Sequence, residues 1–133
     1  MVQQIIFRSL WDDEHMVEYQ VEARNEINST TIKFYGNDEE FKSFGAYLKA
    51  FPQSIGTELK YSSGSSHLQL RVFCYEPNGN TAIHIKTNNW SVEPYGRAAE
   101  FCLLTYPASV NNLGVLLRHW DPRKVKEIVW VAE

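Results

Sequence analysis

Apolar and polar residues alternate most regularly between positions 15 and 24. The apolar members of this alternation are Val17, Tyr19, Val21 and Ala23. A period of two, with charged or amide side chains in between, is typical of an antiparallel strand that buries one face and leaves the other in water. Residues 2–8 and 30–36 are rich in β-branched and aromatic side chains, so they predict the strands on either side of it.

Helical spacing replaces this alternation after Gly36. The apolar residues that recur at that spacing are Phe41, Phe44, Leu48 and Phe51. Asn37 and Glu40 have the spacing of a capping box, so we expect the helix to begin at Asn37 and to end before Pro52. Gly45 lies inside this helix and costs it up to about 1 kcal/mol relative to alanine. We expect this glycine to allow close packing on the sheet.

Residues 67–90 predict a β-hairpin. Their centre, Pro-Asn-Gly-Asn at 77–80, places Asn-Gly between two alternating apolar runs, which strongly indicates a tight turn. Pairing residue 77 with residue 80 sets Arg71 opposite Lys86. The residues that then share the core face are Leu68, Leu70, Val72, Cys74, Ile83 and Ile85.

The rest of the chain predicts three more strands, at 57–61, 97–106 and 125–131, and a second helix from about 108 to 119. The apolar stripe of that helix consists of Val110, Leu113, Leu117 and Trp120. The predicted order is therefore β-β-β-α-β-β-β-β-α-β. This order belongs to the α+β class, with a mainly antiparallel sheet of about seven to eight strands and two helices in a single domain over residues 1–133.

Composition supports one folded domain and excludes several partner classes. The chain has 133 residues, 44% hydrophobic and 22% charged, which suits a globular core and not a disordered or coiled-coil chain. A net charge of −3 supplies no field that would attract nucleic acid or an anionic membrane, so we expect neither as a partner. No apolar run is long enough to span a membrane, and the N-terminal segment is not of the secretory type.

The two cysteines, Cys74 and Cys102, lie in apolar strand-like runs. Cysteines in such runs are usually small buried hydrophobes in a reducing compartment. We therefore expect no disulfide and a cytoplasmic location. Cys74 is predicted to point into the core, where burial raises the thiol pKa. Cys102 is predicted to share the outer face with Glu100, and it would meet His84 if their strands are neighbours.

The outer face of the predicted hairpin is the candidate binding surface. Its residues are Arg71, Phe73, Tyr75, His84, Lys86 and Trp90. Like charges directly opposite each other, as predicted for Arg71 and Lys86, destabilise a strand pair unless an acid neutralises them. Because tryptophan, tyrosine and arginine are the usual anchors of interfaces, this face predicts recognition of a protein or an anionic ligand. In the alternative, the second helix or the N-terminal strands cover these side chains, and Glu100 neutralises the cations.

Other chemistry has little support. The four histidines show no metal-ligand spacing, the cysteines form no CxxC pair, and no catalytic or phosphate-binding motif is present, so no metal, cofactor or catalytic residue is predicted. Acidic residues at 12–14, 18, 22 and 38–40 could form a surface that attracts a basic protein, with the basic segment 118–126 as its counterpart. In the alternative, they form a solvated face and complement a helix dipole.

Residues 32–52, IKFYGNDEEFKSFGAYLKAFP, followed by HLQLRV at 67–72, resemble small α+β immunity proteins that accompany bacterial polymorphic toxins. The resemblance covers a strand, a glycine, an amphipathic helix and a returning strand. It implies a stoichiometric inhibitor that occludes a toxin domain through charged and aromatic surfaces, with no catalytic residues to transfer.

We therefore predict a small protein-binding domain, and the resemblance implies one of inhibitor or immunity type. The alternatives are a small-ligand-binding protein or enzyme with a cleft between sheet and helices, using His84, Glu100 and Arg71, and a structural subunit that forms a homodimer. A deep pocket with converging polar groups would favour the ligand-binding alternative, and a flat exposed patch would favour protein binding.

Overall fold

The computed structural model describes residues 2–132, and these residues form ten elements in the predicted order. The elements are β1 (Gln3–Asp12), β2 (Val17–Arg24), β3 (Ser29–Gly36), α1 (Lys42–Lys49), β4 (Glu58–Ser62), β5 (Leu68–Cys74), β6 (Thr81–Asn88), β7 (Ala98–Thr105), α2 (Pro107–His119) and β8 (Glu127–Ala132). The α+β class is therefore confirmed. None of the helices within residues 2–132 is long and apolar enough to cross a membrane.

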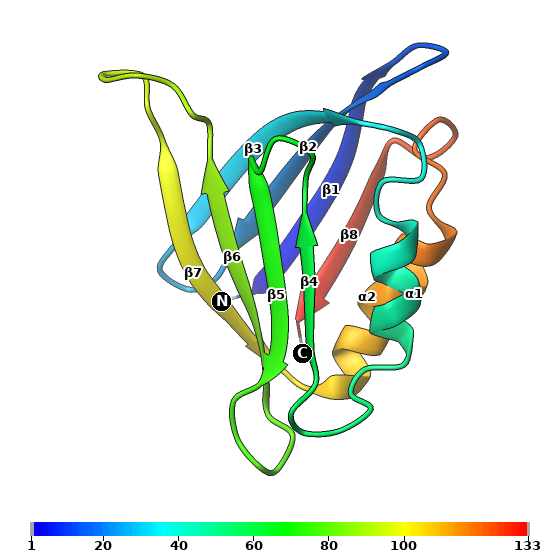
Figure 1. The fold of residues 1–133 in the computed structure, drawn as a ribbon, viewed down its shortest axis with the longest axis vertical. Coiled ribbons are helices and arrows are strands. Elements are labelled where there is room, and N and C mark those ends of the chain that lie inside the picture. The colour runs from blue at the N-terminus through cyan, green and yellow to red at the C-terminus, as the bar shows by residue number, and fades with distance from the viewer. Residues whose placement is uncertain (1, 133) are drawn as a thin grey trace.

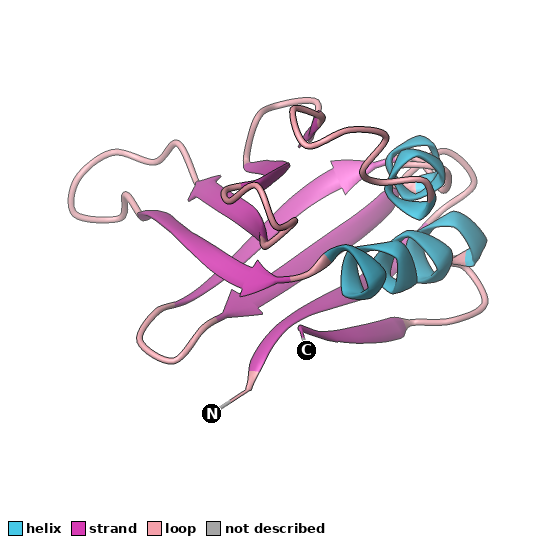
Figure 2. Ribbon diagram, turned by 90° about the horizontal axis from the view of Figure 1, so that it is seen from below, coloured by secondary structure: helices cyan, strands magenta, loops and turns pink. Residues whose placement is uncertain are grey.

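The strands are divided between two antiparallel sheets (Figure 1). Sheet A has the order β3-β2-β1-β8 and sheet B the order β4-β5-β6-β7. Two local meanders, β1-β2-β3 and β5-β6-β7, supply six of these strands, whereas β8 joins β1 from the far end of the sequence. The sheets face each other, and the two helices lie together at one side, next to β4 and β8 (Figures 1 and 2).

The core lies between the inner faces of the two sheets and the helices. Alternation along the strands decides which side chains enter it, as the period of two predicts. Buried residues of the strands include Ile5, Phe7, Val21, Leu70, Val72, Ile83, Ile85 and Leu103. The helices add their predicted stripes, which are also buried: Phe41, Phe44, Leu48 and Phe51, then Val110, Leu113, Leu117 and Trp120.

The register of the β5–β6 hairpin differs from the prediction by two residues. Arg71 lies opposite His84, not opposite Lys86. The reason is the turn, because Tyr75 donates its N–H to the carbonyl of Asn80 at 2.9 Å, which leaves residues 76–79 as a longer loop. Gly79 supplies the positive φ, +94°, that ends it. A shift of two keeps every side chain on its predicted face, so the core positions are unaffected.

Helix α1 begins about one turn later than predicted, with Phe41 at its N-cap position. The capping-box contacts form within the preceding turn. Asn37 Oδ1 accepts from the Glu39 N–H at 2.8 Å, and Glu40 Oε1 accepts from the Asn37 N–H at 3.3 Å. Phe41 itself is buried in the core, where it is 2% exposed.

Gly45 packs against the other helix and not on the sheet, which corrects the prediction. A Cβ on Gly45 would lie 2.6 Å from the backbone N of Arg118 and 2.9 Å from the carbonyl O of Gly114. A Cβ on Gly114 would in turn lie 2.6 Å from the backbone N of Lys49. The two glycines therefore let the helix backbones touch. Asn111 strengthens the contact by donating to the carbonyls of Leu48 and Phe51, at 2.9 and 2.7 Å.

Aromatic rings gather where α1 begins. Phe41 is at their centre, with ring centroids 4.9 to 6.2 Å away. Its partners are Phe7, Tyr19, Phe34, Tyr61 and Trp120. These residues come from β1, β2, β3, β4 and the end of α2, so one ring joins both sheets to both helices.

Two phenols of this cluster are hydrogen-bonded inside the protein. Tyr19 Oη donates to the Asn37 carbonyl at 2.5 Å, and Tyr61 Oη donates to Glu40 Oε2 at 2.8 Å. Burial raises the pKa of both phenols well above the ordinary value, and the nearby charge of Glu40 raises them further. The phenolate forms are therefore strongly disfavoured in the folded state.

These raised pKa values predict alkaline unfolding. The folded-state pKa of Tyr61 lies above the unfolded-state value of about 10, so its contribution to stability is complete below that pH and is lost as pH rises further. We expect absorbance titration to show Tyr19 and Tyr61 ionising together with unfolding. Tyr61→Phe should move the alkaline midpoint to higher pH, whereas Tyr35→Phe, at an exposed position, should not. Ionisation of every tyrosine before unfolding would contradict this expectation.

Candidate functional site

The outer face of sheet B is open, so the alternative in which other elements cover it is wrong. Within residues 2–132, no helix or strand packs against this face, which Figure 1 shows toward the viewer. The N-terminal strands pack on the opposite face, and the helices lie beside it. Arg71, Phe73 and His84 are half-buried, while Lys86 and Tyr75 are exposed. The aromatics here are therefore no second core layer.

Two carboxylates pair with basic side chains of this face. Arg71 Nη1 lies 3.3 Å from Glu58 Oε1, and His84 Nε2 lies 2.8 Å from Glu100 Oε2. Lys86 lies opposite Glu100 on β7 in the sheet register. Glu100 thus faces Lys86, as the sequence suggested, and it also contacts His84. The contribution of Glu58 was missed, because the pairing of β4 with β5 cannot be inferred from local alternation.

The guanidinium of Arg71 is held in place from two sides. It lies over the ring of Phe73, with Cζ 4.1 Å from the ring centroid, while Glu58 binds its edge. A stacked and ion-paired arginine loses little rotamer freedom when a partner binds. Beside it is a hollow of about 410 Å³, whose lining includes Lys60, Arg71, His84, Lys86 and Glu100.

Tyr75 and Trp90 lie at opposite ends of sheet B. Tyr75 follows β5 at the 76–79 loop, and its side chain is 43% exposed. Trp90 follows β6 in the β6–β7 loop, has a φ of +54° and donates its indole N–H to the Ser65 carbonyl at 3.1 Å. The structure therefore brings together Arg71, Phe73, His84 and Lys86, and Trp90 belongs to a different surface.

Cys102 lies directly opposite His84 in the β6–β7 register, which confirms that their strands are neighbours. Burial raises the pKa of its thiol above the ordinary value. The group is therefore a thiol at neutral pH, and this environment does not activate it as a nucleophile. Both Cys74 and Cys102 are free, as expected.

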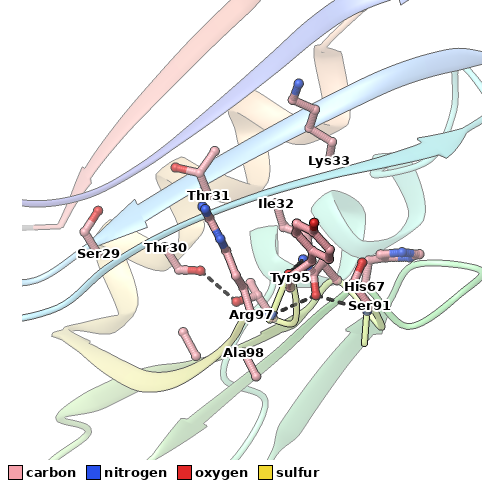
Figure 3. Close-up of a pocket in the computed structure, with 13 residues that line it drawn as sticks. Ser29, Thr30, Thr31, Ile32, Lys33, His67, Ser91, Tyr95, Arg97 and Ala98 are labelled. Carbon is pink, nitrogen blue, oxygen red and sulfur yellow. Dashed lines mark hydrogen bonds between the residues drawn. The ribbon is translucent and has the colours of Figure 1, made fainter. Parts of the chain in front are cut away.

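A second, larger hollow was not predicted. It measures about 740 Å³ and lies between β3 and the β6–β7 loop (Figure 3). Its lining includes Ser29–Lys33, His67, Ser91, Tyr95 and Arg97. The residues that form it come mainly from β3, from the end of β6, from the β6–β7 loop and from the start of β7, so the packing of the two sheets brings them together. A smaller hollow, of about 340 Å³, lies between α1 and β4, where a sheet–helix cleft was considered.

Asn89 organises the β6–β7 loop that bounds the larger hollow. Its Oδ1 accepts from the backbone N–H groups of Ser91 and Arg97, at 3.2 and 2.8 Å, and its Nδ2 donates to the Tyr95 carbonyl at 3.0 Å. Three bonds from one side chain fix the path of the loop and so fix where Arg97 leaves the backbone.

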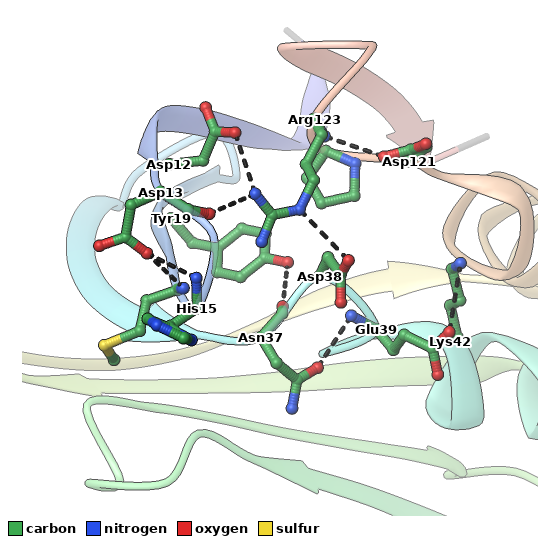
Figure 4. Close-up of polar contacts among 12 residues, drawn as sticks. Asp12, Asp13, His15, Tyr19, Asn37, Asp38, Glu39, Lys42, Asp121 and Arg123 are labelled. Atoms are coloured by element: carbon green, nitrogen blue, oxygen red, sulfur yellow. Dashed lines mark hydrogen bonds and ion pairs between the residues drawn. The ribbon is translucent and has the colours of Figure 1, made fainter.

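The acidic and basic segments bind each other within the molecule, which reduces the acidic surface that the sequence suggested. Arg123 contacts Asp12 Oδ2 and Asp38 Oδ2, each at 3.2 Å, and also donates to the carbonyl of Asp13 (Figure 4). Lys126 Nζ lies 3.1 Å from Asp12 Oδ1. These contacts join the β1–β2, β3–α1 and α2–β8 connections, so the basic segment holds three loops together at one end of the molecule.

The carboxylate of Asp13 forms hydrogen bonds within its own turn. Its Oδ1 accepts from the backbone N–H groups of His15 and Met16, both at 2.8 Å, and these bonds lower the pKa of the Asp13 carboxyl. The carboxylate shapes the β1–β2 turn in the manner of an Asx-turn.

Comparison of the chain with protein-family models, with curated proteins and with solved structures gave no match. In the described part of the chain, no three histidine, cysteine, aspartate or glutamate side chains form a group that could hold a metal ion. The geometry of the open face of sheet B and of the hollow beside β3 is therefore the basis for a functional assignment.

Proposed function

We propose that this chain is a small cytoplasmic protein-binding domain whose interface is the outer face of sheet B. The observation that carries the proposal is the open centre of this face, where Arg71 is stacked on Phe73 and paired with Glu58. Arginine and aromatic side chains are common anchors of interfaces, and anchors that are already ordered cost less entropy on binding. The hollow beside them measures about 410 Å³, so a small ligand bound there is the alternative.

The charges of this face suggest the chemistry of the partner. Lys60 and Lys86 flank the centre and are exposed, and Glu58 is shared between Arg71 and Lys60, at 3.3 and 3.8 Å. A partner that presents carboxylates around an apolar or aromatic centre would complement this pattern. The resemblance to immunity proteins supports a toxin domain as that partner, which the chain would occlude at a one-to-one ratio.

The test compares capture of partners by wild type and by Arg71→Glu/Lys86→Glu. Both proteins are immobilised in source lysate, and captured proteins are quantified by mass spectrometry. We expect one stoichiometric partner, retained at least tenfold less by the variant. Lys49→Glu/Lys124→Glu is the matched control, because it changes the net charge equally at exposed positions away from sheet B. Thermal melts establish that all three are folded.

Two outcomes would contradict the proposal. One is that wild type captures no stoichiometric protein. The other is that the control variant loses the partner as completely as the sheet B variant, because the effect would then follow from net charge. The immunity form of the proposal requires in addition that the captured partner has an activity that the chain abolishes when the two are equimolar.

A further inference from the structure

The edge of β3 is unpaired within residues 2–132. Sheet A ends at β3, while β2 pairs with it along its whole length, from Arg24–Ser29 to Val17–Gly36. An edge strand turns the N–H and C=O groups of alternate residues away from its sheet. In the β2–β3 turn, Asn25 donates its N–H to the carbonyl of Asn28 at 3.0 Å, so Asn28 and every second residue after it bond to β2. Thr31 and Lys33 lie between those residues, so their N–H and C=O groups point away from β2.

The larger hollow follows this edge. Five consecutive residues, Ser29–Lys33, line it, which requires a cavity that runs along the strand. A neighbouring hollow of about 450 Å³ continues it to Tyr35 and shares Lys33 and His67 with it. Together they form a groove beside residues 29–35, long enough for an extended segment of equal length, about 23 Å at 3.3 Å per residue. The β6–β7 loop is the opposite wall (Figure 3).

The charge of this groove is one-sided. The larger hollow is lined by Lys33, His67 and Arg97 and by no carboxylate within the described chain. Arg97 and Lys33 form no ion pair with any described residue, in contrast to Arg71 and Arg123, which are paired. The neighbouring hollow contains one acid, Glu18, at its far end. A ligand with carboxylates near Arg97 would therefore be favoured.

We propose that this groove binds an extended acidic peptide segment, which adds to sheet A as a strand beside β3. Its backbone would pair with the outward groups of Thr31 and Lys33, and its carboxylates would lie near Arg97. Strand addition of this kind takes affinity from main-chain hydrogen bonds and specificity from side-chain contacts. The length of the groove favours a peptide over a small anion, which would use one end of it. This surface is separate from the outer face of sheet B, so it is tested independently.

The experiment selects binders from a display library of random linear peptides with the wild-type chain. We expect enrichment of segments rich in glutamate, aspartate and β-branched residues. A synthetic peptide from the selection, measured by fluorescence polarisation, should bind Arg97→Glu at least tenfold more weakly. Lys124→Glu, an equal charge change at an exposed position that lines neither hollow of the groove, should bind it as wild type does.

Backbone pairing is measured separately. Thr31→Pro removes an outward N–H without removing a bond to β2, and it should abolish peptide binding if a thermal melt shows the variant folded. Hydrogen exchange by NMR does not depend on that variant, and the amides of Thr31 and Lys33 should exchange at least tenfold more slowly with peptide bound. Unchanged exchange would overturn strand addition.

Three further results would overturn the proposal. The first is a selection that yields no binder, or binders unaffected by Arg97→Glu. The second is displacement of the peptide by inorganic phosphate or free glutamate at millimolar concentration, which would indicate a small-anion site. The third is concentration-dependent protection of the Thr31 amide without peptide, which would indicate that a second copy of this chain occupies the edge.

Discussion

Replacing Phe41 by alanine is expected to lower the free energy of unfolding by about 4 kcal/mol, the range found for removal of a buried phenylalanine. Phe41 is 2% exposed and contacts five other aromatic rings. Those rings come from both sheets and from the end of α2, so we expect them not to close together and fill the cavity. Small domains are stable by only about 5–15 kcal/mol, so this loss would remove a large part of the total stability.

Urea unfolding of both proteins, followed by tryptophan fluorescence, measures this loss. Tyr47→Ala is the matched control, because Tyr47 lies in the same helix and its side chain is 66% exposed. It should change the free energy of unfolding by less than about 0.5 kcal/mol. A loss below about 1.5 kcal/mol for Phe41→Ala would mean that the cluster relaxes around the cavity and does not hold the layers together.

Gly45→Ala is expected to destabilise the protein by about 2 kcal/mol, although alanine is the better helix former by up to about 1 kcal/mol. The new Cβ would lie 2.6 Å from the backbone N of Arg118, and a backbone atom cannot rotate away. Helices α1 and α2 would have to separate, which would loosen the bonds from Asn111 to the end of α1. Gly45→Val should have a larger effect in the same direction.

The control for this substitution is Gly56→Ala. An added Cβ at Gly56 has no neighbour within 4 Å, so the free energy of unfolding should stay within about 0.5 kcal/mol of wild type. Thermal melts and urea unfolding provide the measurement. An increase in stability for Gly45→Ala would show that the helices separate at little cost and that helix propensity dominates.

The elements could be predicted because each is specified locally. Alternation over Val17–Ala23 and the apolar spacing from Phe41 onward are properties of single segments, and both buried faces were identified correctly. The β5–β6 register was wrong because the conformation of Gly79 lengthens the turn by two positions. The partner of Gly45 could not be predicted, since nothing within α1 indicates that another helix contacts it.

One part of the candidate site could be predicted from the sequence, and the other part could not. Arg71, Phe73, His84 and Lys86 share one hairpin, so their common face was predictable from a period of two. The groove beside β3 was not, because it depends on which sheet each meander joins. Thr30 and Thr87 are 57 positions apart, and their hydroxyls lie 2.7 Å from each other across the inner side of this groove. No local pattern of residues contains that contact.

The seam between β1 and β8 affects the rates of folding and unfolding. Arg8 on β1 binds Glu127 on β8 across 119 positions, whereas the strands within each meander follow one another in the sequence. Closing so long a loop loses entropy before the new contacts compensate, so we expect β8 to dock after the folding transition state. Weakening the seam would then accelerate unfolding and leave the folding rate almost unchanged. The β1–β8 seam would thus determine how long the folded state lasts, and the meanders how quickly it forms.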